Sequence, residues 1–390
     1  MSNTPKIRFS GFTEDWEQRK LDDVVEFLDT MRKPLEGAKR ISGPYPYYGA
    51  SGIVDYVDGY LFDEELILLS EDGANITDRN YPVCFLASGK YWVNNHAHVL
   101  RTKQANENNF ICNSLERKDY TQYNTGMAMP KLNKETCKKI PILCPGFEEQ
   151  KKVGDYFRNL DHLITLHQRK YDDTKLLKKY MLQKMFPQNG QKVPEIRFSG
   201  FTGDWEQRKL GELGEIMTGS TPSTSKSEYY SEEGIPWVTP TDINALTISD
   251  TPKKLSEKGM KVGRVVPANT ILCTCIASIG KNALLTVKGS FNQQINSLTP
   301  SAENDSYFLL TESELWSEKM KRMAASGTMQ IVNKTEFSEL DTMVPSLDEQ
   351  KIIGLYFRNL DHLITLHQRK CDELQELKKY MLQNMFPQKG

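Results

Sequence analysis

One stretch of fifteen residues, YFRNLDHLITLHQRK, occurs twice without a change, at 156–170 and at 356–370. Each copy lies within a longer repeated segment, 148–188 and 348–388, which is rich in Leu, Lys, Gln, Glu and Arg and has no Pro before its last two residues. These residue types favour helix. About 35 helical residues span roughly 50 Å, more than a compact domain of this size needs internally. The sequence therefore predicts two long spacer helices.

The apolar positions of these segments recur at alternating steps of four and three, for example Val153, Phe157, Leu160 and Ile164. This heptad spacing predicts a coiled-coil seam. Additional leucines such as Leu163 widen the apolar stripe, which suits a helix that contacts more than one neighbour. The predicted subunit-interface residues are Phe157, Leu160, Leu163, Ile164, His167, Phe357, Leu360, Leu363, Ile364 and His367.

A second repeat opens each half of the chain, PKIRFSGFTEDWEQRKL at 5–21 and PEIRFSGFTGDWEQRKL at 194–210. A tandem duplication that keeps its frame while the interior diverges predicts one shared mechanical role and two separate recognition roles. At 390 residues the chain also exceeds the usual size of a single core. The predicted division is a first recognition domain at 1–147, a spacer helix at 148–188, a second recognition domain at 189–347 and a second spacer helix at 348–390.

The divergent interiors contain short apolar runs broken by Gly, Pro, Asn and Asp, which predicts mixed strand and loop. The fold class is therefore α+β, with two mixed α/β modules separated by two long helices. The specific expectations are a buried strand and turn within 61–76, an alternating strand at 90–103, a short helix at 110–120, a polar loop at 214–230, buried strands within 265–285, and a segment at 291–300 that corresponds to 92–100.

Motifs for chemistry are missing from the sequence. It contains no Walker motif and no GxGxxG phosphate cradle. Seven cysteines without a CxxC pair argue against a disulfide framework and a structural zinc site. His162 and His167 are five residues apart, which turns their rings about 140° from each other on a helix and prevents a shared metal. We expect no catalytic residue, no metal site and no cofactor in this chain.

No apolar run has the length of a membrane span, and the polar start lacks the apolar centre of a signal peptide. The sequence thus predicts a cytoplasmic protein that does not contact a membrane.

Charge is unevenly distributed although the formal net charge is only −1. Between Asp22 and Asp78 acidic residues outnumber basic ones by thirteen to four, whereas from Arg79 to Lys139 basic residues lead by ten to four. Such polarity predicts a basic face suited to DNA. A solvated surface with random clustering remains the alternative.

Polar side chains suited to reading bases gather at two corresponding places. Asn and Gln pair with adenine, Arg and Lys with guanine, and Ser and Thr with either. The densest groups are 94–96 and 292–294, although turn residues or strand-edge amides would look the same. Lysines and arginines in both modules are expected to contact phosphate, and Tyr47 and Tyr48 to be exposed on a hairpin. The predicted DNA-binding residues are Tyr47, Tyr48, Lys90, Asn94, Asn95, His96, Arg101, Lys131, Lys134, Ser220, Thr221, Thr239, Thr241, Lys281, Asn292, Gln293, Gln294 and Lys334.

Over essentially its whole length, the chain resembles the specificity (S) subunit of type I restriction-modification systems. The likeness lies in the alternation of two modules with two near-identical helical regions, the opening IRFSGFTxDWEQRKL, and the motifs YPYYGASG, IPWVTPTDI and NQQIN. The resemblance implies that the long helices form an antiparallel coiled coil and hold the two recognition domains in a pseudo-twofold relation. It further implies a bipartite double-stranded DNA target with a spacer set by the helices.

The resemblance also implies partners that carry the chemistry. Two M (methyltransferase) subunits would bind the helices and supply S-adenosylmethionine-dependent adenine methylation. Two R (restriction) subunits would add translocation and cleavage with ATP and Mg. A different class of protein stays open, a non-catalytic coiled-coil scaffold or adaptor whose modules bind proteins; a DNA gel shift separates the two. A fused methyltransferase is excluded because the sequence has no cofactor motif.

Overall fold

The protein is described here by a computed structural model that covers residues 3–188, 190–326 and 331–387. Contacts divide the chain into two compact units. Unit 1 comprises Met1–Arg169 with Gln368–Gly390, and unit 2 comprises Lys170–His367. Each long helix therefore begins in one unit and ends in the other. The four consecutive segments expected from the sequence stay a prediction, because the units follow contacts rather than chain order.

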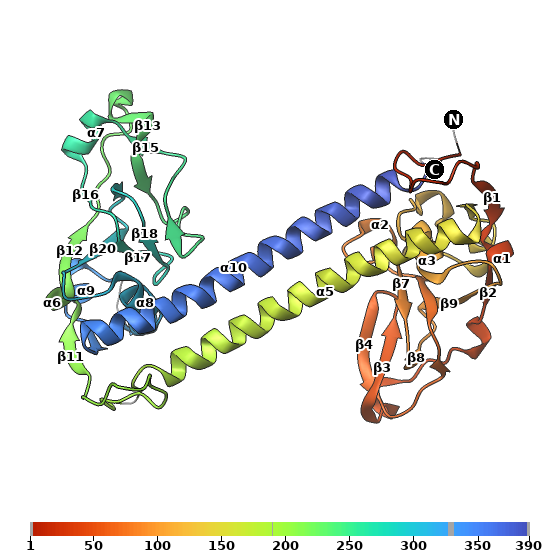
Figure 1. Cartoon of the computed structure of the whole chain (residues 1–390), viewed down its shortest axis with the longest axis horizontal. Coiled ribbons are helices and arrows are strands. Elements are labelled where there is room, and N and C mark those ends of the chain that lie inside the picture. Colours follow the sequence, from red (N-terminus) through yellow and green to blue (C-terminus); the bar gives the residue numbers. More distant parts are fainter. Residues whose placement is uncertain (1–2, 189, 327–330, 388–390) are drawn as a thin grey trace. The chain divides into compact units, whose positions relative to one another are not determined.

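The two spacer helices form as predicted. They are α5 (Phe147–Lys184) and α10 (Leu347–Asn384), of 38 residues each (Figure 1). Both begin with two acidic residues, Glu148 and Glu149 in α5 and Asp348 and Glu349 in α10, which the helix dipole stabilises at this end. Within the described ranges, no helix has an apolar stretch long enough to cross a bilayer.

Inside each unit the two helices run antiparallel. In unit 1, Lys378 of α10 donates to Asp161 of α5 over 2.5 Å, and the Cys371 thiol lies 3.9 Å from the carbonyl oxygen of Ile164. In unit 2, Lys178 of α5 lies 2.8 Å from Asp361 of α10. The second ion pair is the first one with each residue moved by the 200-residue repeat. The antiparallel expectation is confirmed in both units.

Two small sheets form the recognition module of unit 1. One is antiparallel with the order β2-β9-β6-β7, and the other has the order β4-β3-β8-β5 with β3 and β8 parallel (Figure 1). The predicted helix at 110–120 forms as α3 and packs on β7, and β6 is fully buried as expected. The elements are β2 (Val25–Phe27), β3 (Ser42–Gly49), β4 (Gly52–Val57), β5 (Phe62–Asp63), β6 (Leu66–Ser70), β7 (Cys84–Ala87), β8 (Lys90–Val93), β9 (Ala97–Thr102) and α3 (Asn108–Glu116).

Unit 2 repeats this plan with different lengths. Its sheets have the orders β12-β20-β17-β18-β14 and β15-β13-β19-β16, and here β13 and β19 are parallel. The buried strands expected within 265–285 are β17 and β18. The elements are β12 (Gly214–Thr218), β13 (Tyr230–Val238), β14 (Thr247–Ile248), β15 (Lys254–Leu255), β16 (Val265–Val266), β17 (Thr270–Thr274), β18 (Asn282–Leu285), β19 (Gly289–Phe291), β20 (Ile295–Pro300), α7 (Glu257–Val262) and α8 (Ser306–Ser326).

Two expectations about local structure are wrong. The segment 90–103 is not one strand, because a turn at 94–96 separates β8 from β9. The segment 214–230 is not wholly a loop, since β12 forms its first part and pairs with β20.

The repeated opening motif forms a frame beside the start of each long helix. In unit 1, β1 (Glu17–Lys20) pairs with β10 (Pro141–Cys144), and in unit 2, β11 (Glu206–Lys209) pairs with β21 (Asp341–Val344). Arg8 of the first motif donates to both carboxylate oxygens of Glu149, over 2.7 and 2.8 Å. Arg197 makes the same bidentate contact with Glu349, over 2.7 Å for each bond. The motif therefore attaches each module to the first turn of a helix.

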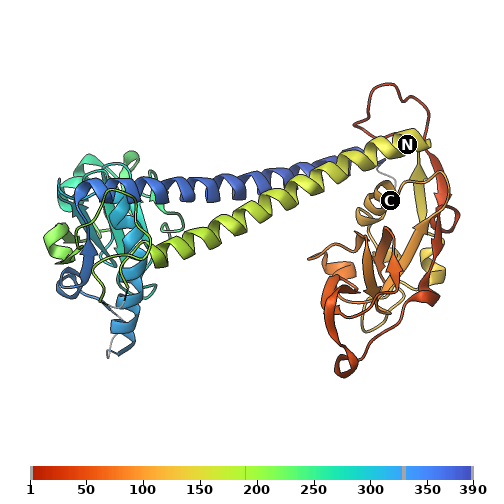
Figure 2. The same ribbon diagram turned by 60° about the horizontal axis from the view of Figure 1, so that its bottom comes forward.

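The far end of each long helix completes a core. The last part of α10 belongs to unit 1 (Figure 2). Phe386, just beyond α10, packs there against Trp16, Phe110 and Phe157 with ring centroids 5.3–6.0 Å apart. Phe186, just beyond α5, makes the corresponding contacts with Trp205, Phe308 and Phe357 in unit 2. Backbone bonds reinforce this closure, from the Ile7 amide to the Asn384 carbonyl and from the Ile196 amide to the Lys184 carbonyl, each 2.9 Å.

Candidate nucleic-acid interface

The turn at 94–96 joins β8 to β9 in unit 1. The Asn94 side chain is 7% exposed, and its Oδ1 accepts a hydrogen bond from the His96 amide over 2.8 Å. The backbone amide of Asn94 donates to the Tyr48 carbonyl over 3.0 Å. Asparagine commonly closes a turn in this way, so for Asn94 the structure supports the turn alternative. Asn95 and His96 are exposed at the tip.

Three loops surround this turn. The Glu71 amide donates to the His96 carbonyl over 2.9 Å, and the Ser70 hydroxyl donates to the Ala50 carbonyl over 2.5 Å. Asp72 forms a backbone bridge with Lys131. We call the turn 94–96 together with the loops 49–51, 71–73 and 124–131 the first cluster. It brings together the predicted residues Asn94, Asn95, His96 and Lys131.

Acidic side chains balance the basic ones in the first cluster. His96 Nδ1 lies 2.8 Å from Asp72, and Lys131 Nζ lies 3.4 Å from Glu71. The same Glu71 forms an ion pair with Arg32, with 2.6 Å between Oε2 and the guanidinium nitrogen. The positive face that the charge distribution predicts is therefore locally neutralised here. Sequence reasoning missed the two carboxylates, whose role depends on pairing between distant segments.

His98 is not exposed beside His96, as an unbroken strand would require. It is buried, and its ring bridges Asp29, 2.8 Å from Nδ1, and the Leu132 carbonyl, 2.7 Å from Nε2. This contact fixes the end of the loop 124–131. That loop exposes Met127 and Met129, which the sequence analysis did not single out. Their position between Gly126 and Pro130 was the available signal.

The turn at 292–294 joins β19 to β20 in unit 2 and has the same geometry. Asn292 is 8% exposed, and its Oδ1 accepts a hydrogen bond from the backbone amide of Gln294 over 3.0 Å. The backbone amide of Asn292 donates to the Val238 carbonyl over 2.9 Å. The predicted correspondence of 291–300 with 92–100 is thereby confirmed. Asn292, like Asn94, builds the turn and leaves Gln293 exposed at its tip.

Neighbouring loops again surround the turn. The Cys275 amide donates to the Gln294 carbonyl over 2.8 Å, and the Thr221 hydroxyl donates to Gln293. Asn292 also lies beside the loop that follows β13, where Thr239 donates to Asp242 over 2.6 Å and contacts Thr241 at 2.8 Å. We call the turn 292–294 with residues 219–221, 239–242 and 275–281 the second cluster. It gathers Ser220, Thr221, Thr239, Thr241, Lys281, Asn292, Gln293 and Gln294.

The remaining predicted DNA contacts lie elsewhere or are enclosed. Tyr47 is buried and its hydroxyl accepts from the Leu35 amide over 2.9 Å, so the expectation of an exposed ring is wrong. Tyr48 is half-buried, and burial raises the pKa of its hydroxyl. Arg101 is held by Glu26 and Glu64, at 3.2 and 2.5 Å. Lys90 Nζ lies over the Tyr60 ring, and Lys134 Nζ lies over the Phe27 ring. Lys334 is exposed at the start of α9 (Lys334–Ser338).

The predicted subunit-interface residues divide into three groups by burial. Phe157, Leu160, Phe357 and Leu360 are buried in the cores of their own units, so they are unavailable to another chain and that assignment is corrected. Leu163 and Leu363 are each 40% exposed. The others, Ile164, His167, Ile364 and His367, are half-buried.

Two copies of one frame, each with a different polar loop cluster on the same turn, define a duplicated recognition protein. The chain belongs to the family of type I restriction modification DNA specificity domains, whose model matches residues 13–175 and 202–376. It is accordingly a type I DNA specificity subunit with two recognition domains, and the adaptor alternative is not favoured.

Individual relatives agree over nearly the whole chain. A putative type I restriction enzyme specificity subunit of Haemophilus influenzae is 26% identical over 355 residues, which are 90% of this chain and 89% of the relative. The crystal structure of the type I S subunit from M. genitalium has a TM-score of 0.75 at 15% identity and covers 99% of this chain and 100% of its own. A chain from a study of complex assembly in the type I system has a TM-score of 0.50 at 18% identity, with 96% and 98% covered. At these identities the solved structures support the fold.

Proposed function

We propose that this subunit reads a bipartite double-stranded DNA target, with one half-site for each cluster and a spacer set by the long helices. The observation that carries the proposal is the shared turn. In both units a buried asparagine closes it by accepting a hydrogen bond from the backbone amide two residues later. The other two residues of the turn differ, Asn95 and His96 in unit 1 against Gln293 and Gln294 in unit 2. One scaffold with different polar tips suits two different base sequences.

The catalytic steps are proposed to reside on partners. Exposed apolar side chains on both helices, including Leu176, Leu177 and Tyr180 on α5 and Leu377 and Tyr380 on α10, offer contact surface for two M subunits. Those subunits would hold S-adenosylmethionine, and two R subunits would hold ATP and Mg. In this proposal the present chain is non-catalytic, holds no cofactor and acts on DNA in the cytoplasm.

A module exchange tests the function. When residues 211–346 are replaced by the recognition module of another specificity subunit, one half-site of the methylated sequence should change and the other should persist. Methylome sequencing of cells that carry the chimera with its M subunit gives the result. A change in both half-sites, or an unchanged target, would contradict independent reading.

Contacts to bases and to phosphates are expected to differ in kind. Gln293→Ala should weaken binding by about 1–3 kcal/mol and relax the preference at one position, because a bidentate amide distinguishes bases. Lys131→Ala should weaken all sequences alike and reduce the salt slope by about one. Binding titrations against a library of single-base variants measure both. Gln207→Ala, at an exposed position of the frame strand β11, is the matched control and should change neither quantity.

A further inference from the structure

The helices α3, which follows β9, and α8, which follows β20, occupy equivalent positions in the two units. Phe110 of α3 packs on Trp16, and Phe308 of α8 packs on Trp205. The first turns also match, because Glu107 accepts from the Phe110 amide over 2.6 Å and Asp305 from the Phe308 amide over 2.8 Å. Position 114 of unit 1 therefore corresponds to 312 of unit 2, whereas α3 ends at Glu116 and Lys118 follows it, while α8 continues through Trp316.

In unit 2 the helix binds the frame strand through the Glu312 carboxyl group and the Trp316 indole nitrogen. Glu312 is buried, and it accepts from the hydroxyl of Thr342 on β21. Trp316 Nε1 donates to the same hydroxyl oxygen over 2.9 Å. Burial raises the pKa of Glu312 to about 8, although hydrogen bonds from Thr342 and from the Met343 backbone oppose the shift. The space between helix and strand is thus filled by an acid and a large aromatic ring.

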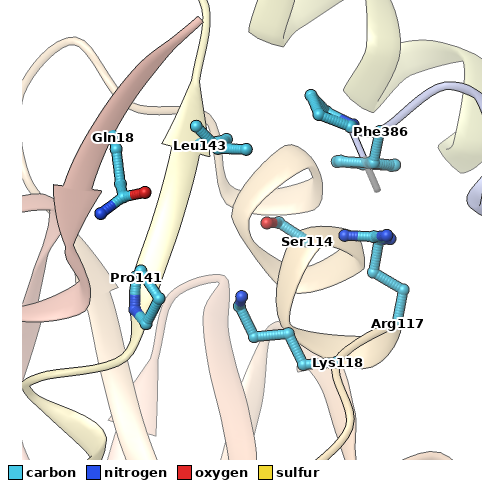
Figure 3. A pocket seen from close by; sticks show the side chains of 8 residues that line it. Gln18, Ser114, Arg117, Lys118, Pro141, Leu143 and Phe386 are labelled. Carbon is cyan, nitrogen blue, oxygen red and sulfur yellow. The ribbon is translucent and has the colours of Figure 1, made fainter. Parts of the chain in front are cut away.

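In unit 1 the position of Glu312 is taken by Ser114, the helix ends two residues before Lys118, and the space between helix and strand is a cavity of about 20 Å³. Figure 3 shows the Lys118 side chain pointing toward it, with Ser114 above and Leu143 of β10 opposite. Lys118 is only 9% exposed. The side chain at the position of the acid is shorter in unit 1, and a lysine beyond the helix faces the space that remains. The lining consists of Gln18, Ser114, Arg117, Lys118, Pro141, Leu143, Phe386 and Pro387.

The cavity has two positive charges and no acid to balance them. Arg117 lies beside Lys118 with its guanidinium carbon 5.8 Å from the Phe386 ring centroid. Among the residues that the structure describes, no carboxylate forms an ion pair with either of them. Burial and, to a smaller extent, the Arg117 charge lower the pKa of Lys118 to about 8. Buried charges ordinarily have a partner of opposite sign, so the site needs an anion.

We propose that this cavity binds one small inorganic anion of the size of chloride, held by Lys118 and Arg117 and by the Ser114 hydroxyl. The anion would take the place that the Glu312 carboxyl group takes in unit 2. The volume suits one small ion, since about 10–15 Å³ admits one water-sized particle. Bound there, it joins α3 of the recognition domain to the frame and to the end of α10.

Bromide provides the direct test. In crystals of the full chain grown with sodium bromide, an anomalous peak is expected in the cavity within contact distance of Lys118 Nζ. A water molecule or an empty cavity at that place would overturn the proposal, and so would bromide that sits only at exposed surface lysines.

Hydrogen exchange of α3 in solution provides a second test. At equal ionic strength, amides of 108–116 should exchange about tenfold more slowly in sodium chloride than in sodium gluconate, the effect of chloride at about ten times its Kd. Amides of α8 in unit 2 should show no such difference. Lys118→Met should remove the chloride effect. Ser114→Glu, which supplies the acid of unit 2, should also remove it while keeping α3 protected in gluconate. Chloride dependence that persists in both variants, or that never appears in the parent, would contradict the site.

Discussion

Replacing Phe386 by Ala is expected to destabilise unit 1 by about 3–5 kcal/mol, the usual cost of truncating a buried aromatic ring, and to leave unit 2 folded. The ring is almost fully buried and contacts Trp16, Phe110 and Phe157 at 6.0, 5.3 and 5.9 Å between centroids. A residue just beyond α10 thus completes the core of the first recognition domain.

Hydrogen exchange with peptide resolution measures this loss for each unit. Phe186→Ala is the matched variant, because it removes the equivalent ring from unit 2 and should reverse the pattern. Loss of protection to the same degree in both units, for either variant, would show that the two cores do not unfold separately.

Replacing Arg8 by Ala is expected to cost unit 1 about 3–5 kcal/mol, because it leaves a buried carboxylate without its partner. The Glu149 side chain is 3% exposed and the Arg8 side chain 15%. Their bidentate contact raises the pKa of the Arg8 guanidinium. Chemical unfolding monitored by hydrogen exchange in unit 1 measures the change, and Arg197→Ala should produce the same loss in unit 2 through Glu349.

Two further variants isolate the ionic cause. Arg19→Ala removes an exposed pair with Glu17 and should cost less than about 1 kcal/mol. In a Glu149→Gln background, Arg8→Ala should cost much less than in the parent, since no charge is then left unpaired. An equal cost in both backgrounds would assign the effect of Arg8 to packing instead.

The long helices could be predicted because the repeated segment has local helical composition and spacing. Their antiparallel pairing could be predicted from the resemblance to the family, which rests on the duplicated frame. The turn at 94–96 did not, since the apolar residues on either side keep the alternation of a strand. The bond from the His96 amide to Asn94 decides the matter, and no periodicity reports it. Similarly, the burial of Tyr47 depends on parallel pairing of β3 with β8, which lies outside its local sequence.

The heptad pattern also predicted an apolar contact face on each helix, but it did not identify the residues that pack against that face. Phe157 and Leu160 belong to one stripe with Leu163 and Ile164, yet the first two face the core of their own unit and Leu163 remains partly exposed. Spacing along a helix identifies a face, and the neighbour that covers each part of this face is set by residues more than 200 positions away, such as Leu374 and Phe386.

The closure of each unit makes the order of the two modules arbitrary. In unit 2 the chain runs from Lys184 through eleven residues to Ile196, whose amide bonds back to the Lys184 carbonyl. In unit 1 the same bond joins Ile7 to Asn384, which lie near opposite ends of the sequence. The same backbone bond thus closes both units, once within a continuous stretch of chain and once between distant parts of the sequence. A circular permutant that begins with the second module, and in which a comparable linker joins the present ends, would retain every contact described for both units.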